Sequence, residues 1–191
     1  KKFIRSNPCD NIPTIFGSKS DILILDNDSL ITFLGNLLEE PKLIPYVSLC
    51  LFGGVRPTEC IQLRWEDIHL EDEKRQIYIS QHVSKVRFDR YTPISDNLVQ
   101  WLSPHIGKPI KIPNLRKSLD RIKKNIVWQK DIMRHTAISY FMGKFKNIYE
   151  VSEQLGNQPS IIKKHYQKAV LQNDTDFFWS RTPLKVQELI D

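Results

Sequence analysis

Three cationic side chains and one tyrosine are the residues of this sequence best suited to chemistry. Arg56 lies between a glycine pair and a proline in FGGVRPTEC, Lys85 lies in VSKVRF, Arg134 in RHTAISYF and Tyr166 in KKHYQK. Fixed cations can stabilise negative charge that develops in a reaction, and a tyrosine hydroxyl can act as a nucleophile. Each residue alone is a weak sign, because such side chains are usually structural or solvated.

Other classes of catalytic site find no support in the sequence. The histidines show neither HExxH nor another metal-ligand spacing, and no acidic cluster resembles a two-metal site; they are His69, His82, His105, His135 and His165. The motifs GxGxxG, GxxxxGK[ST] and GxSxG do not occur. We therefore expect neither a metal nor a nucleotide cofactor.

Positive charge is concentrated in one part of the chain. The formal net charge is +6, and residues 108–134 hold nine Lys or Arg against two Asp, so the rest of the chain sums to −1. A local excess of this kind is typical of a surface that binds a polyanion such as DNA, although a solvated basic helix has the same composition.

Four segments, taken together, resemble the tyrosine recombinases, or phage integrases. They are GGVRPTE, SKVRFDRYTPI, MRHTAISYF and EQLGNQPSIIKKHYQK, and they follow the order and spacing of the family's runs G-x-R-x-x-E, K-T-x-x-x-R-x-x-P, H-x-x-R-H and L-G-[HW] with a later tyrosine. The resemblance covers residues 26 to 170. It implies the DNA breaking-rejoining catalytic-domain fold of that family.

The resemblance also implies a role for each reactive residue. Arg56 and Arg134 would grip the non-bridging oxygens of a DNA phosphate, since guanidinium groups stay charged and bind phosphate with two parallel hydrogen bonds. Lys85 would give a proton to the departing 5′ oxygen, and Tyr166 would become joined to the 3′ phosphate. Glu59, three residues after Arg56, would hold that arginine in position.

The sequence departs from the family pattern at two positions. Asp131 stands where the family has a histidine, and a carboxylate beside a phosphate would be repelled unless it were protonated. Either Lys130 replaces the missing histidine, or Asp131 takes part directly, or neither does. Asn157 stands where the family has His or Trp, and its amide can still donate a hydrogen bond. We expect His135 to support the site rather than to react.

The resemblance names double-stranded DNA at a specific site as the partner, with a homotetramer assembled on it. Candidate DNA-contacting side chains are cationic and lie in the basic segment and the hairpin: Lys117, Arg121, Lys123, Lys124, Arg87 and Arg90. No apolar run reaches the roughly 18–20 residues that cross a bilayer, so we expect a soluble, intracellular protein. The resemblance further implies a cytoplasmic, nucleoid-associated protein of bacterial or phage origin.

Hydrophobic periodicity predicts a mainly α fold with one small antiparallel sheet. A helix capped by Asp26 or Asp28 carries Leu30, Phe33, Leu34, Leu37 and Leu38 at helical spacing. Further helices are expected in PYVSLCLF, in TECIQL after Pro57, after Ser95, along 115–126 and near 131–145, 147–155 and 160–168. Alternation in QIYIS, VSKV and RYTPI predicts a hairpin over 76–94, with Pro93 at a strand end or edge.

Three regions are expected along the chain. Residues 1–20 read as a linker from a preceding DNA-binding domain, 21–170 as the catalytic domain and 171–191 as a tail. The tail carries Phe177, Phe178 and Trp179, which pack either on a neighbouring protomer or on their own domain. Cys50 and Cys60 are expected to be reduced thiols in the core.

Two further functions compete with a recombinase. One is a recombinase-derived DNA-binding protein that has lost turnover through the changes at Asp131 and Asn157. The other is a type IB topoisomerase, which shares the fold and chemistry but needs no partner site. A DNA binder would not require the nucleophile Tyr166, and the hairpin and the LGN segment are closer to the integrases.

Overall fold

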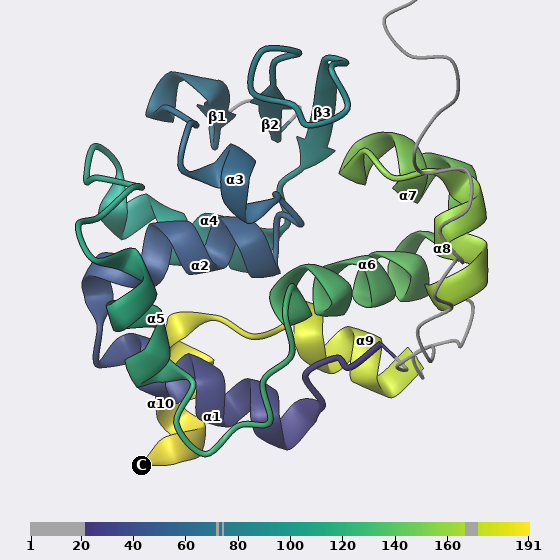
Figure 1. Cartoon of the computed structure of the whole chain (residues 1–191). Coiled ribbons are helices and arrows are strands. Elements are labelled where there is room, and N and C mark those ends of the chain that lie inside the picture. Colours follow the sequence, from purple (N-terminus) through teal and green to yellow (C-terminus); the bar gives the residue numbers. More distant parts are fainter. Residues whose placement is uncertain (1–21, 72, 74, 167–171) are drawn as a thin grey trace, which may run out of the picture.

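The protein is mainly helical with one small sheet, as predicted (Figure 1). The computed structural model describes residues 22–71, 73, 75–166 and 172–191. The helices are α1 (Asn27–Leu38), α2 (Ile44–Leu51), α3 (Pro57–Cys60), α4 (Asp96–Leu102), α5 (Leu115–Ile122), α6 (Ile132–Phe145), α7 (Ile148–Leu155), α8 (Pro159–Tyr166), α9 (Gln172–Trp179) and α10 (Pro183–Ile190). The expected linker, residues 1–20, lies outside the described residues.

Helix α1 begins as its sequence predicts. The Asp26 carboxylate accepts a hydrogen bond of 2.8 Å from the backbone N–H of Ser29, which satisfies one of the free amides of the first turn. The residues at helical spacing, Leu30, Phe33, Leu34 and Leu37, are buried and form the face of α1 that packs on the core.

The three-stranded antiparallel sheet differs from the expected hairpin. Its strands, in the order β1 (Ile68–His69), β2 (Gln76–Ile79) and β3 (Arg90–Pro93), include a first strand that the sequence did not indicate. The expected strand VSKV is wrong, because these residues lie in a loop, 80–89, whose amides bond elsewhere. The N–H of Ser84 donates to the carbonyl of Ser80, and the N–H of Lys85 to Glu59. Pro93 ends the edge strand β3, as predicted.

Helices α2 and α6 pack against each other at the centre of the molecule and carry the other elements on their sides. Helix α2 is buried along its whole length, and α4 packs beside it. Helix α6 also contacts α7, α8 and α9, so it joins the sheet side of the molecule to the tail (Figure 1). The thiols of Cys50 and Cys60 are free and buried in this core, as predicted.

The described part of the tail packs on its own domain, which is one of the two expected alternatives. Phe178 is fully buried and stacks on Tyr140 with ring centroids 4.1 Å apart. The indole N–H of Trp101 donates to the carbonyl of Arg181 at 3.0 Å. Helix α10 then lies along α1 at the far end from the sheet (Figure 1).

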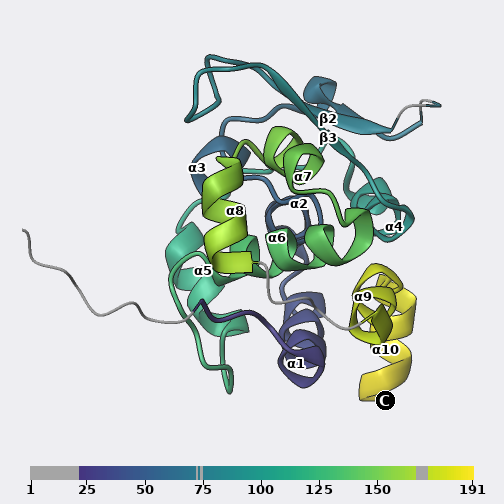
Figure 2. The ribbon, with the colours of Figure 1, turned by 90° about the vertical axis from the view of Figure 1, so that its right-hand side faces the viewer.

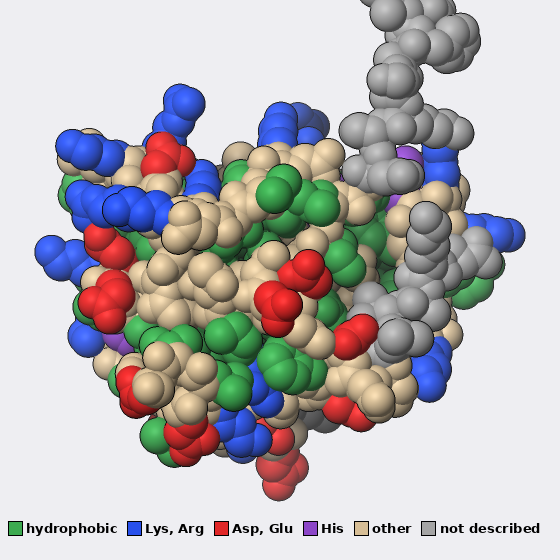
Figure 3. Space-filling view, turned by 90° about the horizontal axis from the view of Figure 1, so that it is seen from below, with side chains coloured by type: hydrophobic (Ala, Val, Ile, Leu, Met, Phe, Trp, Pro, Cys, Tyr) green, Lys and Arg blue, Asp and Glu red, His purple; other side chains and the backbone are tan. Residues whose placement is uncertain are grey.

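The face formed around α1 and α10 is chemically mixed. Seen from below, hydrophobic and acidic side chains occupy much of its middle, and Lys and Arg lie mostly toward its margin (Figure 3). No helix in the described ranges is long and apolar enough to cross a membrane.

Candidate active site

Arg56 is held where the chain turns from α2 into α3. Gly54 makes this turn with a φ of +60°, and a Cβ there would lie 2.7 Å from Leu155, so both the backbone conformation and the close packing require glycine. Arg56 then precedes Pro57, the first residue of α3. Its guanidinium donates to Glu59 at 3.2 Å, to Asn157 at 3.0 Å and to the carbonyl of Gly156.

Glu59 is the buried carboxylate that organises this region. It has no exposed surface, and it accepts hydrogen bonds from Arg56, from the backbone N–H of Lys85 and from two nitrogens of Arg90. Burial opposes its ionisation, but the hydrogen bonds and charge of Arg90, helped by Lys85 and Arg56, hold the pKa of Glu59 below its usual value. The structure therefore places Glu59 in contact with Arg56, and it adds Arg90 and Lys85 to the same network.

Arg90 corrects one expectation from the sequence. It was predicted to contact DNA, but its side chain is only 4% exposed and forms a buried ion pair with Glu59. It also donates to the hydroxyl of Ser84 at 3.2 Å, which ties the loop 80–89 to strand β3. The guanidinium of Arg90 is thus engaged by Glu59 and Ser84 inside the protein, which assigns it to holding these residues in place rather than to an exposed DNA contact.

Arg134 reaches the same place from the first turn of α6. It is buried, and its guanidinium donates to the carbonyls of Gly54 and Leu155, both at 2.5 Å, and to Asn157 at 2.8 Å. Burial, together with the charges of Arg56 and Arg90, lowers the pKa of Arg134 to about 9. The group therefore remains charged at neutral pH.

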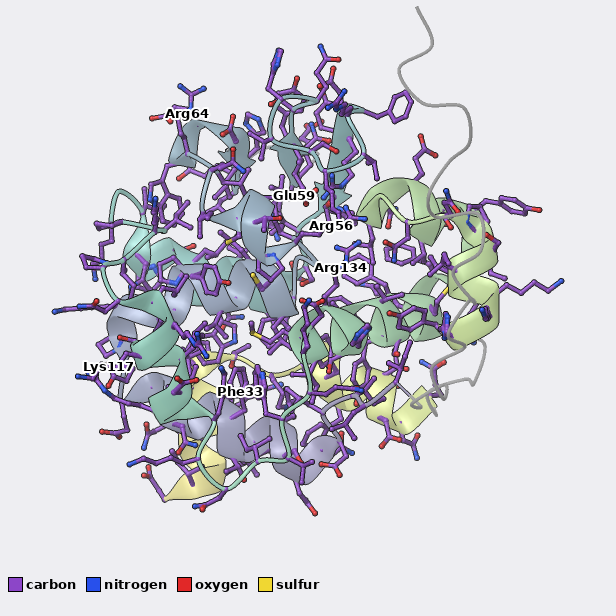
Figure 4. All side chains as sticks on the ribbon, in the orientation of Figure 1. Phe33, Arg56, Glu59, Arg64, Lys117 and Arg134 are labelled. Carbon is purple, nitrogen blue, oxygen red and sulfur yellow. The ribbon has the colours of Figure 1, made fainter. Side chains whose placement is uncertain are left out.

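Arg56 and Arg134 converge on one oxygen atom. The Oδ1 atom of Asn157 accepts a hydrogen bond from each guanidinium, and Figure 4 shows the two arginines facing one another between α3 and α6. Among the described residues, Glu59 is the only carboxylate that accepts from Arg56 or Arg90, and Arg134 donates to carbonyl groups and to Asn157 but to no carboxylate. Three cations and one anion leave an excess of positive charge at the position of this oxygen, so the arrangement suits an anionic oxygen.

The loop after α7 leaves room for these cations. Gly156 ends α7 with a φ of +62°, and a Cβ there would lie 3.1 Å from Arg56 and 3.2 Å from Arg90. A hollow of about 960 Å³ lies beside it, lined by Gly156, Asn157 and Arg90 and by Val86 and Phe88 of the loop 80–89. The cluster therefore adjoins a space large enough for part of a substrate.

Tyr166 ends α8 next to the arginine cluster. Its ring is only 6% exposed and packs among Ile138, Leu155 and Ile162, while its hydroxyl lies 2.5 Å from Nδ1 of His135. Burial raises the pKa of Tyr166 to about 12, and the nearby charge of Arg134 opposes that rise only in part. The phenol is therefore protonated at neutral pH and points toward an imidazole.

Three other predicted residues lie at the margin of the site. The side chain of Lys85 is exposed, while its backbone is anchored to Glu59 at 3.1 Å. Lys130 and Asp131 are both exposed and precede α6, where Asp131 has a left-handed φ of +61° and its carboxylate does not cap the helix. Burial lowers the pKa of His135 and raises that of Tyr166; the charge of Asp131 opposes the first shift and adds to the second, so it acts on both residues through space.

The basic segment lies on the same side of the molecule as the site. Viewed from the side, α3, α5 and α8 all lie along one edge, and α10 lies on the other (Figure 2). Arg87, Lys117, Arg121 and Lys124 are exposed, although Arg121 pairs with Glu40 at 2.5 Å. Lys123 is half-buried, with its ammonium 5.0 Å from the centre of the Trp128 ring. A further hollow of about 530 Å³, lined partly by Lys117 and Arg121, adjoins α5.

Sequence reasoning missed the buried part of this site. Arg90 follows the expected hairpin turn at the position of the arginine in the family's K-T-x-x-x-R run, which was the available signal. The carbonyl groups of Gly54, Leu155 and Gly156 carry no signal in the sequence, because any residue has a carbonyl. Within the described residues, no three His, Cys, Asp or Glu side chains gather as a metal site requires.

Comparisons with known proteins agree with this architecture. A crystal structure of XerA recombinase superposes with a TM-score of 0.62 at 13% identity, over 85% of this chain and 65% of that one. Two crystal structures of XerH site-specific recombinase, bound to difH substrate before cleavage and to palindromic difH after cleavage, give TM-scores of 0.54 and 0.57 at 16% and 18% identity. They match over 90% and 100% of this chain and 54% and 59% of theirs, so the chain spans less than two thirds of these recombinases.

Sequence comparison identifies the family directly. No curated protein matches the chain as a relative. The sequence model of the phage integrase family matches residues 28–125, just over half of the sequence. This range contains Arg56, Glu59, Lys85 and Arg90. The chain therefore belongs to the phage integrase family, with the fold of the tyrosine recombinases.

Proposed function

We propose that this chain is the catalytic domain of a site-specific DNA recombinase that cuts and rejoins DNA through a 3′-phosphotyrosine. One observation carries the proposal: two guanidinium groups, those of Arg56 and Arg134, donate to the same oxygen atom of Asn157 beside a buried tyrosine. A phosphodiester oxygen placed there would receive the same hydrogen bonds, strengthened by its negative charge.

The arginine cluster would act mainly on the transition state. Attack on a phosphodiester builds negative charge on the non-bridging oxygens, and donors that are already fixed need no reorganisation as this charge develops. Arg134 is fixed by two backbone carbonyls and Arg56 by Glu59 and a carbonyl. Rotation of the Asn157 side chain would free the oxygen position and turn its amide N–H toward the phosphate.

The covalent step would be a transesterification. The hydroxyl oxygen of Tyr166 forms a bond to phosphorus, the bond from phosphorus to the 5′ oxygen breaks, and Lys85 gives that oxygen a proton. Lys85 suits this role because its backbone is tied to Glu59 while its side chain is free to reach the substrate. A 5′ hydroxyl of a partner strand then reverses the step, and the phosphotyrosine conserves the bond energy.

DNA would bind along the side that carries α3, α5 and α8. The exposed cations Arg87, Lys117 and Lys124 would contact the backbone, and Lys123 and Arg121 lie next to them. The XerH structures contain their difH substrate, which supports a DNA duplex as the ligand of this face. We propose that four copies assemble on two duplexes, since strand exchange needs two partner sites.

The proposal is tested by trapping the covalent intermediate. The full-length protein is incubated with a nicked duplex of its attachment site, so that the cleaved strand diffuses away and the protein–DNA adduct accumulates. We expect an adduct that is absent in Tyr166→Phe and present in Tyr149→Phe, a matched change of an exposed tyrosine in α7. Specific DNA binding without any adduct would instead support a DNA-binding protein that has lost turnover.

The roles of Lys130 and Asp131 are tested with the same substrate. If Lys130 replaces the usual histidine, Lys130→Ala slows adduct formation sharply while Asp131→Asn does not. If Asp131 takes part directly, the order of the two effects is reversed. Small effects of both changes would mean that another residue of the site supplies the missing group.

A further inference from the structure

The geometry points to His135 as the catalytic base of this site: we propose that it accepts the hydroxyl proton of Tyr166 as the tyrosine attacks phosphorus. This inference rests on the proposed function and names a residue for a step that the arginines and Lys85 leave open. Nδ1 of His135 is 2.5 Å from the hydroxyl oxygen of Tyr166, within reach of direct proton transfer.

Two neighbouring positions of α6 serve two parts of the site. Successive residues of a helix point about 100° apart, so Arg134 and His135 leave α6 in different directions. Arg134 points to the oxygen of Asn157, while His135 meets Tyr166 with ring centroids 5.9 Å apart. Adjacent residues of α6 thus contact both the arginine cluster and the proposed nucleophile Tyr166.

The attacking phenol needs a base. With a pKa of about 12, only about one Tyr166 in 10⁵ is ionised at pH 7. Burial lowers the pKa of His135 below its usual range, so the imidazole is neutral and able to accept a proton at neutral pH. The charged or titratable groups around it are Asp131, which raises its pKa, and Arg134 and His165, which lower it.

The position of His135 also accounts for the departure at Asp131. Residues 131 and 135 are four apart on the same helical face, and the N–H of His135 donates to the carbonyl of Asp131 at 2.9 Å. Lys130 and Asp131 are exposed, and neither makes a side-chain hydrogen bond to a described residue. An imidazole one turn further along the helix therefore provides the basic nitrogen that position 131 lacks, and Asp131 would stabilise the imidazolium that forms.

The proposed proton transfers balance in both directions. During cleavage, the O–H bond of Tyr166 breaks, its proton moves to Nδ1 of His135, and the departing 5′ oxygen receives a proton from Lys85. During rejoining, the attacking 5′ hydroxyl returns a proton to Lys85, and His135 returns its proton to the tyrosine oxygen. This requires that neutral His135 carry its single ring proton on Nε2 before the reaction.

The first test uses His135→Asn in the full-length protein. The asparagine oxygen can accept a hydrogen bond near the position of Nδ1 but cannot take up the proton. We expect cleavage of the nicked duplex to slow by about 10²- to 10⁴-fold with unchanged DNA binding. Wild-type rates should be level with pH near neutrality, whereas the variant should gain about tenfold per pH unit, because hydroxide must then remove the proton.

A second substrate distinguishes the proposed base, His135, from the proposed acid, Lys85. A duplex with sulfur in place of the 5′ bridging oxygen has a leaving group that needs no proton. We expect this substrate to restore cleavage by Lys85→Ala but not by His135→Asn. Restoration of His135→Asn would show that His135 acts on the leaving group and would overturn the proposal, as would a wild-type rate or a level pH profile for this variant.

Nitrogen NMR of the histidines tests the contact without catalysis. In the wild-type protein we expect Nδ1 of His135 to be unprotonated, with a resonance that shifts in Tyr166→Phe; a proton on Nδ1 would contradict the proposal even if the protein cuts DNA. Because this measurement uses the wild-type protein, it also decides the matter if His135→Asn fails to fold. If the wild-type protein forms no adduct although the NMR result is as expected, the proposed enzymatic function is contradicted, but the contact between His135 and Tyr166 is not.

Discussion

Two cationic regions of this protein differ in how their charges are held. Around Glu59, three guanidinium groups are buried or nearly so, and each makes several hydrogen bonds within the protein. Along α5, the cations are mostly exposed, and Arg121 and Lys123 each pair with one surface carboxylate. The buried cations are therefore suited to hold one anionic oxygen atom in place, whereas the exposed cations are suited to attract an extended anionic backbone such as that of DNA.

The way the charges are held suits the buried arginines to catalysis and the exposed cations to binding affinity. A buried, multiply bonded arginine cannot follow a moving ligand, but it needs no reorganisation when charge develops at the place it faces. An exposed lysine is strongly hydrated and mobile, so it attracts a polyanion over the Debye length of about 8 Å at physiological salt without fixing its position. Figure 4 shows this contrast between Arg134, at the centre, and Lys117, at the periphery.

The largest effect should come from the buried arginines. Arg134→Ala removes one of the two guanidinium groups that meet at Asn157, and we expect DNA cleavage to fall by about 10³-fold or more, since loss of one fixed donor alone costs about 10²–10³. Arg56→Ala should behave similarly. Adduct formation on the nicked duplex measures both, and a loss below tenfold for either would contradict the assignment of that arginine to the phosphate.

Glu59 should matter next, through stability as well as cleavage. Glu59→Gln keeps the shape but leaves Arg90 buried without its counter-charge, which costs about 3–5 kcal/mol of the free energy of unfolding. Urea titration followed by circular dichroism measures this change. The matched change Glu40→Gln, at the exposed pair with Arg121, should cost less than about 1 kcal/mol.

The same carboxylate predicts a dependence of stability on pH. Because the pKa of Glu59 is lower in the folded protein than in the unfolded chain, its ionisation favours folding above about pH 4.3. This contribution is lost as the pH falls through the lower, folded-state pKa. Urea titrations at several acidic pH values should therefore show a steeper loss of stability in the wild-type protein than in Glu59→Gln; equal slopes would rule out the predicted linkage.

A glycine substitution tests how closely the cluster is packed. Gly156→Ala strains a left-handed residue by about 1–2 kcal/mol and places a methyl group 3.1 Å from Arg56. Gly107→Ala carries the same kind of strain, at a φ of +78°, with no atom within 4 Å. We expect similar losses of stability from both but slower cleavage only from Gly156→Ala; equal cleavage rates would show that the arginines tolerate displacement.

The smallest effect should come from single cations of α5. Lys117→Ala should weaken DNA binding a few-fold and reduce the slope of log affinity against log salt by about 0.9, as expected for one lost phosphate contact. The rate of cleavage by bound protein should not change. Lys185→Ala, in α10 on the opposite side, serves as the control; an equal effect of that change would mean that affinity reflects net charge and not this face.

Much of the architecture could be predicted because it depends on neighbours in the chain. The apolar spacing of α1 and the cap at Asp26 are local features, and each has the predicted consequence in the structure. The strand expected at 83–86 is wrong because a contact between distant residues overrides the local pattern there. Its alternation resembled a strand, but the amide of Lys85 bonds to Glu59, 26 residues away, instead of to a neighbouring strand.

The family, the helical content and the candidate residues for a phosphate site follow from the order of amino acids alone, because they depend on residue type, spacing and short-range periodicity. Three contacts depend instead on the folded core: Arg90 is buried against Glu59, Asn157 lies between two arginines, and His135 meets Tyr166. Each of these contacts joins residues from 23 to 101 positions apart, brought together by the packing of α6 against α2, α7 and α8 and of α7 against β3. No local pattern encodes such a distance, since it is set by the shape of the whole core.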